Sequence, residues 1–323
     1  MAREETANKH AYLIIAHDKF EQLRMLCEML DFPQHDIYIH IDACASDFDA
    51  DTVRGCTKFS PITFVDRIEV NWGGYSQIQA ELNLLEAAKA SHTDYGYYHL
   101  LSGADLPLRP ARELWEYFDG NAGTEFVHYC TNDFTANPPV QERAKVYHLF
   151  QERIKRSGKI VTTVERAVVA VQNLLRVNRY RSAGIEKIYC GSNWFSITDR
   201  LAEHVLAHKS WIQRTFHCGC CVDECFLQTL MIGSEFEDKL YMPVGSDDCR
   251  ANMRYIDWKR GNPYVFRAED YNELVSSQCL FARKFDENIS REICQMLYAH
   301  CMKTENIDFY ETATEEKGAL YAK

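Results

Sequence analysis

The spacing of hydrophobic positions alternates between two periods along the first third of the chain. Short apolar runs with β-branched residues predict buried strands at 11–16, 36–42, 62–65, 97–101 and, more weakly, 125–129. Between them, apolar residues recur at helical spacing over 20–30 and 76–90. Alternating strands and helices predict an α/β domain with a largely parallel central sheet.

Polar side chains follow the predicted strands at their carboxyl ends. His17 and Asp18 follow the first strand, Asp42 ends the second, and Asp105 follows the fourth. Ligands of open α/β sheets bind beyond the carboxyl ends of the strands. Taken singly, each of these residues is more typical of a turn or a helix cap. Asp18 with Glu21 predicts a capping box at the start of the first helix.

The pattern becomes helical from about 141 to 177, with a polar break predicted at Ser157-Gly158-Lys159. This region is basic, through Arg143, Lys145, Arg153, Lys155, Arg156, Arg166, Arg176, Arg179 and Arg181. A basic helical face can hold an anionic acceptor or a membrane surface, although such faces are more often simply solvated. We therefore expect one domain over 10–300, with a helical insertion over about 141–180 and a C-terminal tail over 301–323.

The charge balance and the cysteines narrow the class of protein. The 323 residues carry a net charge of −11, from 36 Lys and Arg against 47 Asp and Glu, which argues against nonspecific binding to nucleic acid. The 13 cysteines are odd in number and mostly scattered, as expected for reduced thiols rather than a disulfide framework. No apolar run approaches the roughly 18 residues of a membrane span. We expect a cytoplasmic protein, with peripheral membrane contact through the basic insertion as an option.

A candidate general base lies in the stretch 222–231. Asp223 occupies the position of a helix N-cap, and apolar residues then recur at the spacing of a helix with one buried side. Glu224 would open this helix, where the first-turn N–H groups favour an ionised carboxylate. A fixed, ionised carboxylate can act as a general base. Asp and Glu are also common at helix starts without any catalytic role, so both interpretations stay open here.

Metal sites are weakly indicated. The cluster Cys218, Cys220, Cys221 and Cys225 offers four thiols for zinc, but it lacks the paired CxxC spacing of structural zinc sites. Neither HExxH nor a glycine-rich phosphate loop occurs. Asp47 and Asp49 have Asp-x-Asp spacing but lie in a polar loop beyond the second strand. We expect no metal, so that any diphosphate would be neutralised by Arg and Lys.

The last third of the chain supplies candidate cations at Arg254, Lys259, Arg260, Arg267, Arg283 and Lys284. Arg283 and Lys284 are flanked by the apolar residues Leu280, Phe281 and Phe285. Partial desolvation of a basic pair favours a specific anion site. The alternative is a surface pair neutralised by a neighbouring acid such as Asp286.

These motifs together resemble one family. They are Ile41-Asp42, Trp72-Gly73-Gly74-Tyr75-Ser76, Leu101-Ser102-Gly103-Ala104-Asp105-Leu106-Pro107-Leu108, Gly191-Ser192-Asn193-Trp194-Phe195, the stretch from Asp223-Glu224 to Thr229, Arg254-Tyr255-Ile256-Asp257-Trp258 and Leu280-Phe281-Ala282-Arg283-Lys284-Phe285-Asp286. Their order is similar to that of the core-2/I-branching glycosyltransferases, a family of branching β-1,6-N-acetylglucosaminyltransferases and peptide O-xylosyltransferases. The resemblance covers about residues 10 to 300.

The resemblance implies a GT-A-like, Rossmann-type nucleotide-sugar-binding fold and an inverting, metal-independent transfer from a UDP-sugar. It implies that Glu224 is the catalytic base and that Lys284, with Arg283, holds the diphosphate. A second diphosphate contact is left open among Arg267, Arg254 and Arg260. Donor contacts are implied for Asp42, Asp105, Trp72 and Gly73.

For the acceptor side, the resemblance points to Trp194 and Asn193, although Trp194 is equally typical of a core residue. Asn193 stands where the xylosyltransferase branch carries an aspartate, which weakens a direct transfer of that activity. UDP-N-acetylglucosamine is the leading donor and UDP-xylose the second, with a glycan or glycolipid acceptor. A noncatalytic glycan- or nucleotide-binding protein of the same fold is a further alternative. The animal members are anchored in the Golgi and disulfide-bonded, whereas this chain fits a bacterial-type cytoplasmic enzyme better.

Overall fold

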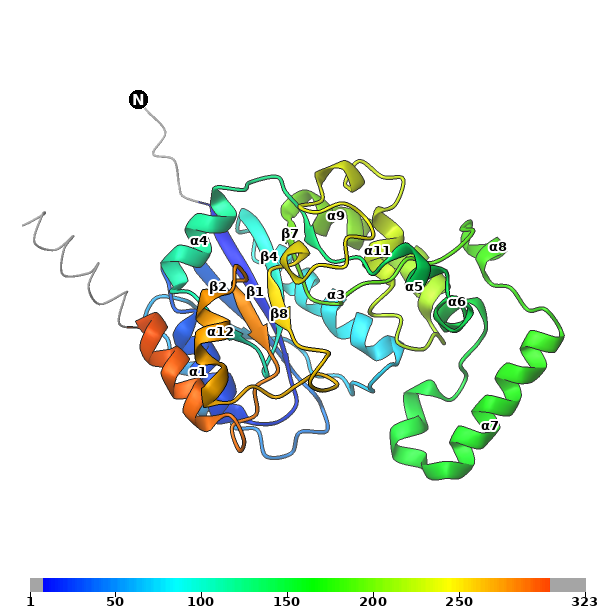
Figure 1. Ribbon diagram of the computed structural model, residues 1–323, viewed down its shortest axis with the longest axis horizontal. Helices are drawn as coiled ribbons and strands as arrows, with labels where there is room; N and C mark the ends of the chain where they lie inside the picture. The colour runs from blue at the N-terminus through cyan, green and yellow to red at the C-terminus, as the bar shows by residue number, and fades with distance from the viewer. Residues whose placement is uncertain (1–7, 303–323) are drawn as a thin grey trace, which may run out of the picture.

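A six-stranded sheet forms the centre of the protein (Figure 1). The computed structural model describes the backbone of residues 8–302 and the side chains of this range except 154–158. The strand order is β3-β2-β1-β4-β7-β6, from β1 (Lys9–Ala16), β2 (His35–Ile41), β3 (Ile62–Phe64), β4 (Tyr95–Ser102), β6 (Phe126–Val127) and β7 (Phe195–Thr198). The strands β1 to β4 are parallel, and β7 runs antiparallel to both β4 and β6. The strands predicted from the hydrophobic runs are confirmed, and so is the mainly parallel α/β fold class.

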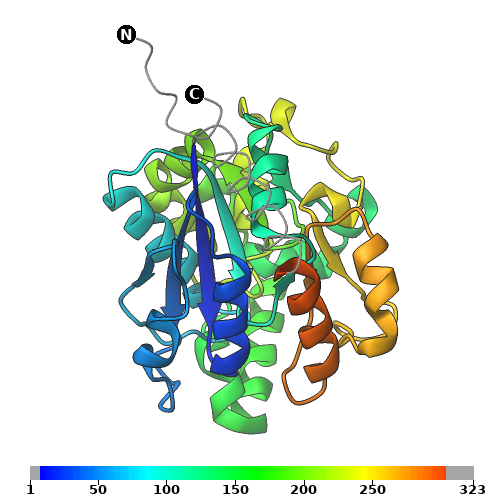
Figure 2. The same ribbon diagram turned by 90° about the vertical axis from the view of Figure 1, so that its left-hand side faces the viewer.

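Helices cover both faces of this sheet. Side chains of successive strand residues point to opposite faces, so Ala11 and Leu13 lie in one apolar cluster while Tyr12 and Ile14 lie in the other. The first cluster is completed by α3 (Tyr75–Ala90), α9 (Asp199–Ala207), α10 (Lys209–Phe216) and α11 (Phe226–Met231). The second is completed by α1 (Phe20–Met29), α4 (Ala111–Asp119), α12 (Tyr271–Ser276) and a helical segment at 291–302. Figure 2 shows α1 and the segment 291–302 side by side on their face of the sheet.

A small second sheet pairs the segment that follows β4 with strands from the last third of the chain. Its order is β5-β9-β8, from β5 (Leu106–Pro107), β9 (Phe281–Arg283) and β8 (Arg254–Ile256). Leu106 pairs with Ala282 in the antiparallel β5–β9 ladder. Because β5 directly follows Asp105, this pairing places Arg283 beside the polar end of β4.

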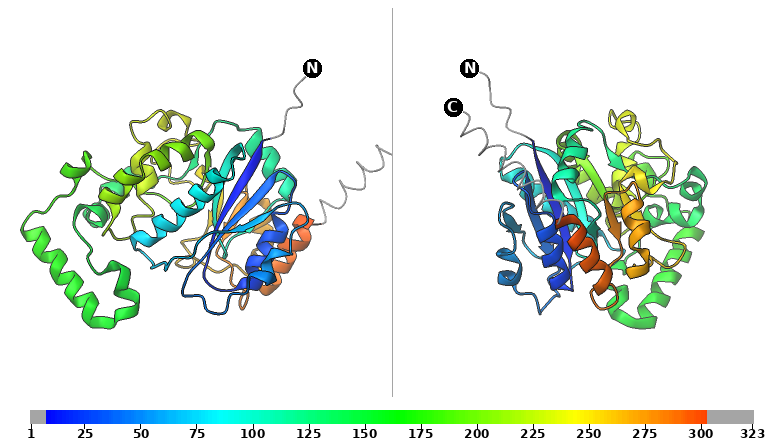
Figure 3. Two further views of the ribbon diagram at one scale, coloured as in Figure 1. Left: turned by 180° about the vertical axis from the view of Figure 1, so that it is seen from behind. Right: turned by 60° about the vertical axis from the view of Figure 1, so that its left-hand side comes forward.

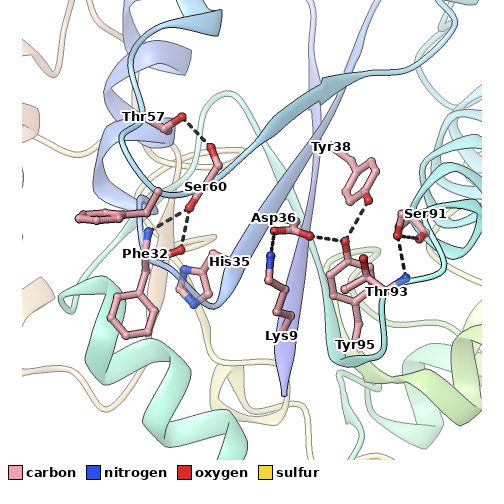
Figure 4. A network of polar contacts seen from close by, with 12 residues as sticks. Lys9, Phe32, His35, Asp36, Tyr38, Thr57, Ser60, Ser91, Thr93 and Tyr95 are labelled. Carbon is pink, nitrogen blue, oxygen red and sulfur yellow. Dashed lines mark hydrogen bonds and ion pairs between the residues drawn. The ribbon is translucent and has the colours of Figure 1, made fainter. Parts of the chain in front are cut away.

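A buried polar network fixes the register of the strands at their amino ends (Figure 4). The Lys9 ammonium and the Tyr95 hydroxyl both donate to the Asp36 carboxylate, at 2.7 and 2.6 Å, and Tyr38 and Tyr95 share a hydrogen bond of 2.9 Å. Asp36 is buried, and these partners satisfy both of its oxygens. The opposite, carboxyl ends of the strands are left for ligand binding.

The insertion after β6 projects from the body of the protein (Figures 1 and 3). It contains α5 (Asn132–Ala136), α6 (Pro138–Lys145), η1 (Gln151–Arg153), α7 (Ile154–Leu174) and α8 (Tyr180–Ala183). The break predicted at Ser157-Gly158-Lys159 was wrong, because α7 runs through it. Ser and Gly cost a helix interior only about 1 kcal/mol each, which a helix of 21 residues tolerates.

The capping box predicted at Asp18 was also wrong. The residue before α1 is Lys19, in the left-handed region at φ 55°, and its side chain does not cap the helix. A first-turn N–H, that of Gln22, donates instead to the carboxylate of the distant Glu287 at 3.2 Å. Lys19 instead lies between Asp18 and Asp286, at 3.3 and 2.9 Å from their carboxylates. The attraction of one ammonium to two carboxylates therefore takes Asp18 away from the capping role.

The remaining short elements are α2 (Ala50–Arg54), η2 (Glu237–Lys239), η3 (Cys249–Ala251) and η4 (Ala268–Asp270). All 13 cysteines lie within the described residues and all are free thiols. Within the described part of the chain, the helices are too short or too polar to cross a lipid bilayer. The predicted tail lies outside the described residues from 303 onward.

Candidate active site

Two aspartates lie at the carboxyl ends of parallel strands, as the sequence predicts. Asp42 directly follows β2 and is largely buried, and its Oδ1 accepts from the backbone N–H of Cys44 at 2.8 Å. Asp105 follows β4 and is fully buried, and it accepts from the backbone N–H of Ser102 at 2.7 Å and from the Ser102 hydroxyl at 3.0 Å. Both carboxylates are thus fixed in turns at the edge where such sheets bind ligands.

Arg283 connects Asp105 to Trp194. Its guanidinium lies 3.5 Å from Asp105 Oδ1 and 4.2 Å from the centre of the Trp194 ring. Burial lowers the pKa of Arg283, and the Asp105 carboxylate opposes that shift. Trp194 is half-buried, so one part of its ring packs on Arg283 while another part remains accessible. The structure therefore brings three predicted site residues into one contact chain.

Lys284, the other member of the basic pair, differs from Arg283 in its surroundings. Its backbone pairs with the segment 264–266, since Lys284 N donates to the Tyr264 carbonyl and Phe266 N donates to the Lys284 carbonyl. Within the described residues, no hydrogen bond or ion pair engages the Lys284 ammonium. This pairing also places Lys284 next to Arg267, which is exposed and follows the buried Phe266. These two cations thus lie on adjacent, backbone-paired segments of the chain.

Arg254 is buried in the core, where its guanidinium binds protein acceptors. It is 1% exposed, and its guanidinium donates to the Ser196 hydroxyl at 2.8 Å and to the carbonyls of Phe195 and Leu100 at 2.6 and 3.2 Å. Burial lowers its pKa to about 9. A guanidinium committed to internal acceptors is not available to a diphosphate, so this placement corrects the sequence-based candidacy of Arg254.

Arg260 is likewise committed to protein acids. It forms ion pairs with Asp257, with Asp270 at 2.6 Å and with Glu273 at 3.0 Å. Three carboxylates already neutralise its single charge. Of the three arginines considered for a second diphosphate contact, the structure leaves Arg267 as the one without such a commitment.

Glu224 lies in a turn just before α11 rather than inside that helix. The backbone N–H groups of Cys225 and Phe226 both donate to the Val222 carbonyl at 3.0 Å, and α11 begins at Phe226. The predicted N-cap role of Asp223 was therefore wrong: the tight turn at 222–225 moves the helix start from Glu224 to Phe226, two residues later. Glu224 itself is 39% exposed and faces accessible space.

The carboxylate of Glu224 is held by a residue that the motif analysis did not assign to the site. Arg143, from α6, donates to Glu224 Oε2 at 2.6 Å. The proximity of Glu224 raises the pKa of Arg143, although burial of the guanidinium opposes that shift. Arg143 was noted only as one of many basic residues in the insertion, and nothing in the sequence pairs it with a position 81 residues away.

The backbone of Glu224 joins it to the loop that carries Trp194. The Gly191 N–H donates to the Glu224 carbonyl at 2.9 Å, and Gln228 of α11 donates to the Ser192 carbonyl at 2.8 Å. Asn193 follows in this loop and is half-buried. Contacts therefore run from Glu224 through the 191–194 loop to Arg283 and Asp105. The 191–194 loop thus links the candidate base to the polar end of β4.

Trp72 and Gly73 lie on the Glu224 side of this site. The Gly73 carbonyl accepts from Cys221 N at 2.8 Å, and Trp72 is exposed. Gly73 has φ +73°, and a Cβ there would lie 2.7 Å from Gln151 Nε2. The positive φ therefore favours glycine, and a larger residue would also displace the Gln151 amide.

Asp223 lies beneath Glu224, in the protein interior. Its Oδ2 accepts from the Gln77 amide at 3.0 Å, while Oδ1 has no partner among the described residues. Burial, and then the Glu224 charge, raise the pKa of Asp223 to about 7. Glu81 is fully buried close by, and its pKa is raised by burial and then by Asp223. Asp223 and Glu81 thus form a pair of buried acids in the protein interior near Glu224.

The cysteine cluster does not converge as a zinc site would. Cys220 and Cys221 have their sulfurs 4.0 Å apart, but Cys225 Sγ turns to the Cys221 carbonyl and Cys218 Sγ to His217. Among the described residues, the group spaced for a metal is His128, Cys130 and Asp247. His128 accepts from Ser192 N through Nδ1 and lies 3.2 Å from Asp247 through Nε2, so both ring nitrogens already have protein partners.

Comparison with known proteins identifies the family. The model of the Core-2/I-Branching enzyme family matches residues 10–275. The chain belongs to this family. It is therefore a glycosyltransferase, and the predicted family is confirmed.

The similar proteins are acetylglucosaminyltransferases and xylosyltransferases. A human N-acetyllactosaminide β-1,6-N-acetylglucosaminyl-transferase is 25% identical, over 89% of this chain and 71% of its own length. A bovine β-1,3-galactosyl-O-glycosyl-glycoprotein β-1,6-N-acetylglucosaminyltransferase is 24% identical, over 93% and 71%. A xylosyltransferase of Caenorhabditis briggsae is 22% identical, over 88% of this chain but 36% of its own length.

Proposed function

We propose that this glycosyltransferase transfers N-acetylglucosamine from UDP-N-acetylglucosamine to a hydroxyl of a glycan or glycolipid acceptor, with inversion and without a divalent metal. The observation that carries the proposal is the placement of Glu224. One oxygen of its carboxylate is fixed by Arg143, and Oε1 accepts no hydrogen bond from the described residues. A fixed carboxylate with one open oxygen is what removal of a proton from an acceptor hydroxyl requires.

The reaction is a single displacement in this proposal. Glu224 takes the proton of the acceptor hydroxyl while that oxygen forms a bond to the anomeric carbon. The bond from the anomeric carbon to the UDP oxygen breaks, and UDP leaves with the electron pair. Attack from the side opposite the leaving group inverts the anomeric configuration.

Lys284 and Arg267 neutralise the departing diphosphate in this proposal. Support comes from the Lys284 ammonium, which is not engaged by the described residues, and from the backbone pairing that brings Arg267 next to it. Charge developing on a leaving phosphate must be stabilised by fixed cations or a metal. Asp47 and Asp49 are a weaker metal pair, because Asp49 already caps α2 by accepting from Asp51 N at 3.0 Å.

The donor side consists of Asp42, Asp105 and Arg283. Asp105 is positioned by Ser102 and Arg283, and Trp194 offers an apolar ring beside them. An aromatic ring face is a common wall for a sugar. The 13 free thiols support a reducing compartment, and we place the reaction in the cytoplasm.

N-acetylglucosamine is preferred over xylose as the transferred sugar because Asn193 stands where the xylosyltransferase branch carries an aspartate. The two acetylglucosaminyltransferases are also slightly more similar to this chain, at 25% and 24% identity against 22% for the C. briggsae xylosyltransferase. UDP-xylose remains the second candidate donor.

The test is UDP release from a panel of UDP-sugars, in EDTA and then with Mn²⁺. We expect turnover of UDP-N-acetylglucosamine in EDTA, stimulated by a β-galactoside acceptor. Turnover of UDP-xylose alone would replace the donor assignment. Strict dependence on Mn²⁺ would contradict the role of Lys284 and Arg267.

A further inference from the structure

The helix α7 presents its apolar side to solvent. Ile160, Val164, Val171, Leu174 and the following Leu175 are exposed, with Ile160 at 79% and Leu174 at 82%. Positions 160, 164, 171 and 174 recur at three-, four- and seven-residue intervals, which places them along one side of a helix. The outer side of this helix is therefore an apolar stripe.

The inner side of α7 is mixed, with polar residues among half-buried valines. Glu165 is buried and accepts from the backbone N–H of Phe150 at 3.1 Å, and it lies 3.3 Å from His148. Gln172 exchanges hydrogen bonds with the backbone of Tyr147 at 2.7 and 2.8 Å. The helix is thus attached to the protein through these polar contacts and through the half-buried Val161, Val168 and Val169. Its second apolar face, the exposed stripe, is the feature that an ordinary surface helix lacks.

The charges around the stripe have one sign. Residues 143–181 contain ten Lys and Arg against two Glu, in a chain whose net charge is −11. Lys159, Arg166 and Arg176 are exposed on or next to α7, whereas Glu165 is buried and Glu152 is bound to Ser76. The exposed surface of this arm is therefore apolar and basic.

We propose that α7 is a docking surface for an anionic lipid bilayer. A helix with an apolar side and flanking Lys and Arg lies in the interface of such a bilayer, its apolar side among the acyl chains and its cations at the headgroups. Pairing of α7 with a second copy would bury the same stripe, but it would bring like charges together. The arm also projects from the body, where a flat surface can reach it (Figures 1 and 3).

The insertion that contains α7 also contacts the candidate base. The same insertion carries Arg143, which holds Glu224. A bilayer bound to α7 would therefore contact the same insertion that holds the candidate base, which suits an acceptor held in the membrane. This consequence rests on the proposed function, whereas the docking itself does not.

The test is flotation of the whole protein with vesicles of phosphatidylcholine, with and without 30% phosphatidylglycerol, in the absence of donor. We expect binding to the anionic vesicles only, weakened by salt. The double variant Val171→Gln, Leu174→Gln should lower the partition coefficient about tenfold, since it removes the apolar anchor without adding charge. Arg166→Gln should lower it about fivefold.

The matched control is Phe59→Gln, which removes an apolar side chain of 49% exposure far from the insertion and should leave vesicle binding unchanged. Thermal unfolding of each variant confirms that the fold is intact. Absence of binding to anionic vesicles would overturn the proposal, as would binding that the α7 variants do not change. A dimer in light scattering that Val171→Gln, Leu174→Gln converts to a monomer, without vesicle binding, would assign the stripe to a second copy instead. Because no sugar transfer is measured, these outcomes do not depend on the proposed reaction.

Discussion

The guanidinium of Arg143 donates to the carboxylate of Glu224 at 2.6 Å, joining the helical insertion to the loop before α11. The ion pair is partly buried, with the two side chains 23% and 39% exposed. It fixes one oxygen of Glu224 and leaves the other open. We regard Arg143 as a positioning residue for the proposed base.

Replacing Arg143 by Gln should therefore lower kcat more than it changes KM for the donor. A carboxylate released from its partner samples several rotamers, and misplacement of a catalytic group by about 1 Å can cost about a hundredfold in rate. Steady-state kinetics with Arg143→Lys as the matched variant check this, and Lys should restore part of kcat. Equal loss in both variants, accompanied by a lower melting temperature, would indicate a purely structural role.

Lys284→Ala should weaken UDP binding by about ten- to a hundredfold, because a hydrogen bond to a charged group contributes about 1.5–3 kcal/mol. Arg267→Ala should have a smaller effect of the same sign. Isothermal titration with UDP measures both. Arg200→Ala is the control, since it removes an exposed arginine that is paired with the exposed Glu235. Unchanged UDP affinity in Lys284→Ala would remove this residue from the diphosphate site.

Arg254→Met should destabilise the protein by about 3 kcal/mol or more while leaving the UDP affinity of the folded protein unchanged. The substitution leaves the carbonyls of Phe195 and Leu100 and the Ser196 hydroxyl without their buried donor. Denaturant titration and UDP titration below the melting temperature separate the two effects. A specific loss of UDP binding at unchanged stability would return Arg254 to the list of diphosphate contacts.

Several features of this molecule were predictable from sequence because they depend on neighbours along the chain. The strands that end at Ala16 and Ile41 are apolar runs followed by polar residues, and that pattern alone places Asp42 at the ligand-binding edge. The pairing of Arg143 with Glu224 depends on how the insertion folds back. No local pattern contains that information.

Three arginines that are equivalent candidates in the sequence differ in burial and in partners in the structure. Arg254, Arg260 and Arg267 were equal candidates, and only the ladders of the second sheet place the first in the core and the third beside Lys284. The helix start at Phe226 and the contact of the α1 N-terminus with Glu287 were missed for a similar reason. In both places, contacts made by the folded chain outweighed the local capping preference.

Asp223 should make folding stability depend on pH. Its pKa is raised by burial, and then by Glu224, from the ordinary value of 3.8 to about 7. The folded state therefore retains a proton that the unfolded state has lost between these values, so stability falls as the pH rises from about 4 to 7. The loss from this group amounts to at most about 4 kcal/mol.

Asp223→Asn removes this titration while keeping the shape of the side chain and an oxygen for the Gln77 amide. The free energy of unfolding of the variant, relative to the wild-type protein, should rise steadily between pH 4 and pH 7. Denaturant titration at four pH values over this range measures the difference. Parallel pH profiles for the two proteins would show that Asp223 does not titrate there.

The most direct test of the central claim is sugar transfer by Glu224→Gln, measured in EDTA beside UDP binding by the same preparation. The amide keeps the size of the side chain and cannot accept the proton of the acceptor hydroxyl. We predict that transfer falls by at least about a thousandfold while UDP affinity stays within about twofold of the wild-type value. Transfer at the wild-type rate in this variant would contradict Glu224 as the base and the mechanism built on it.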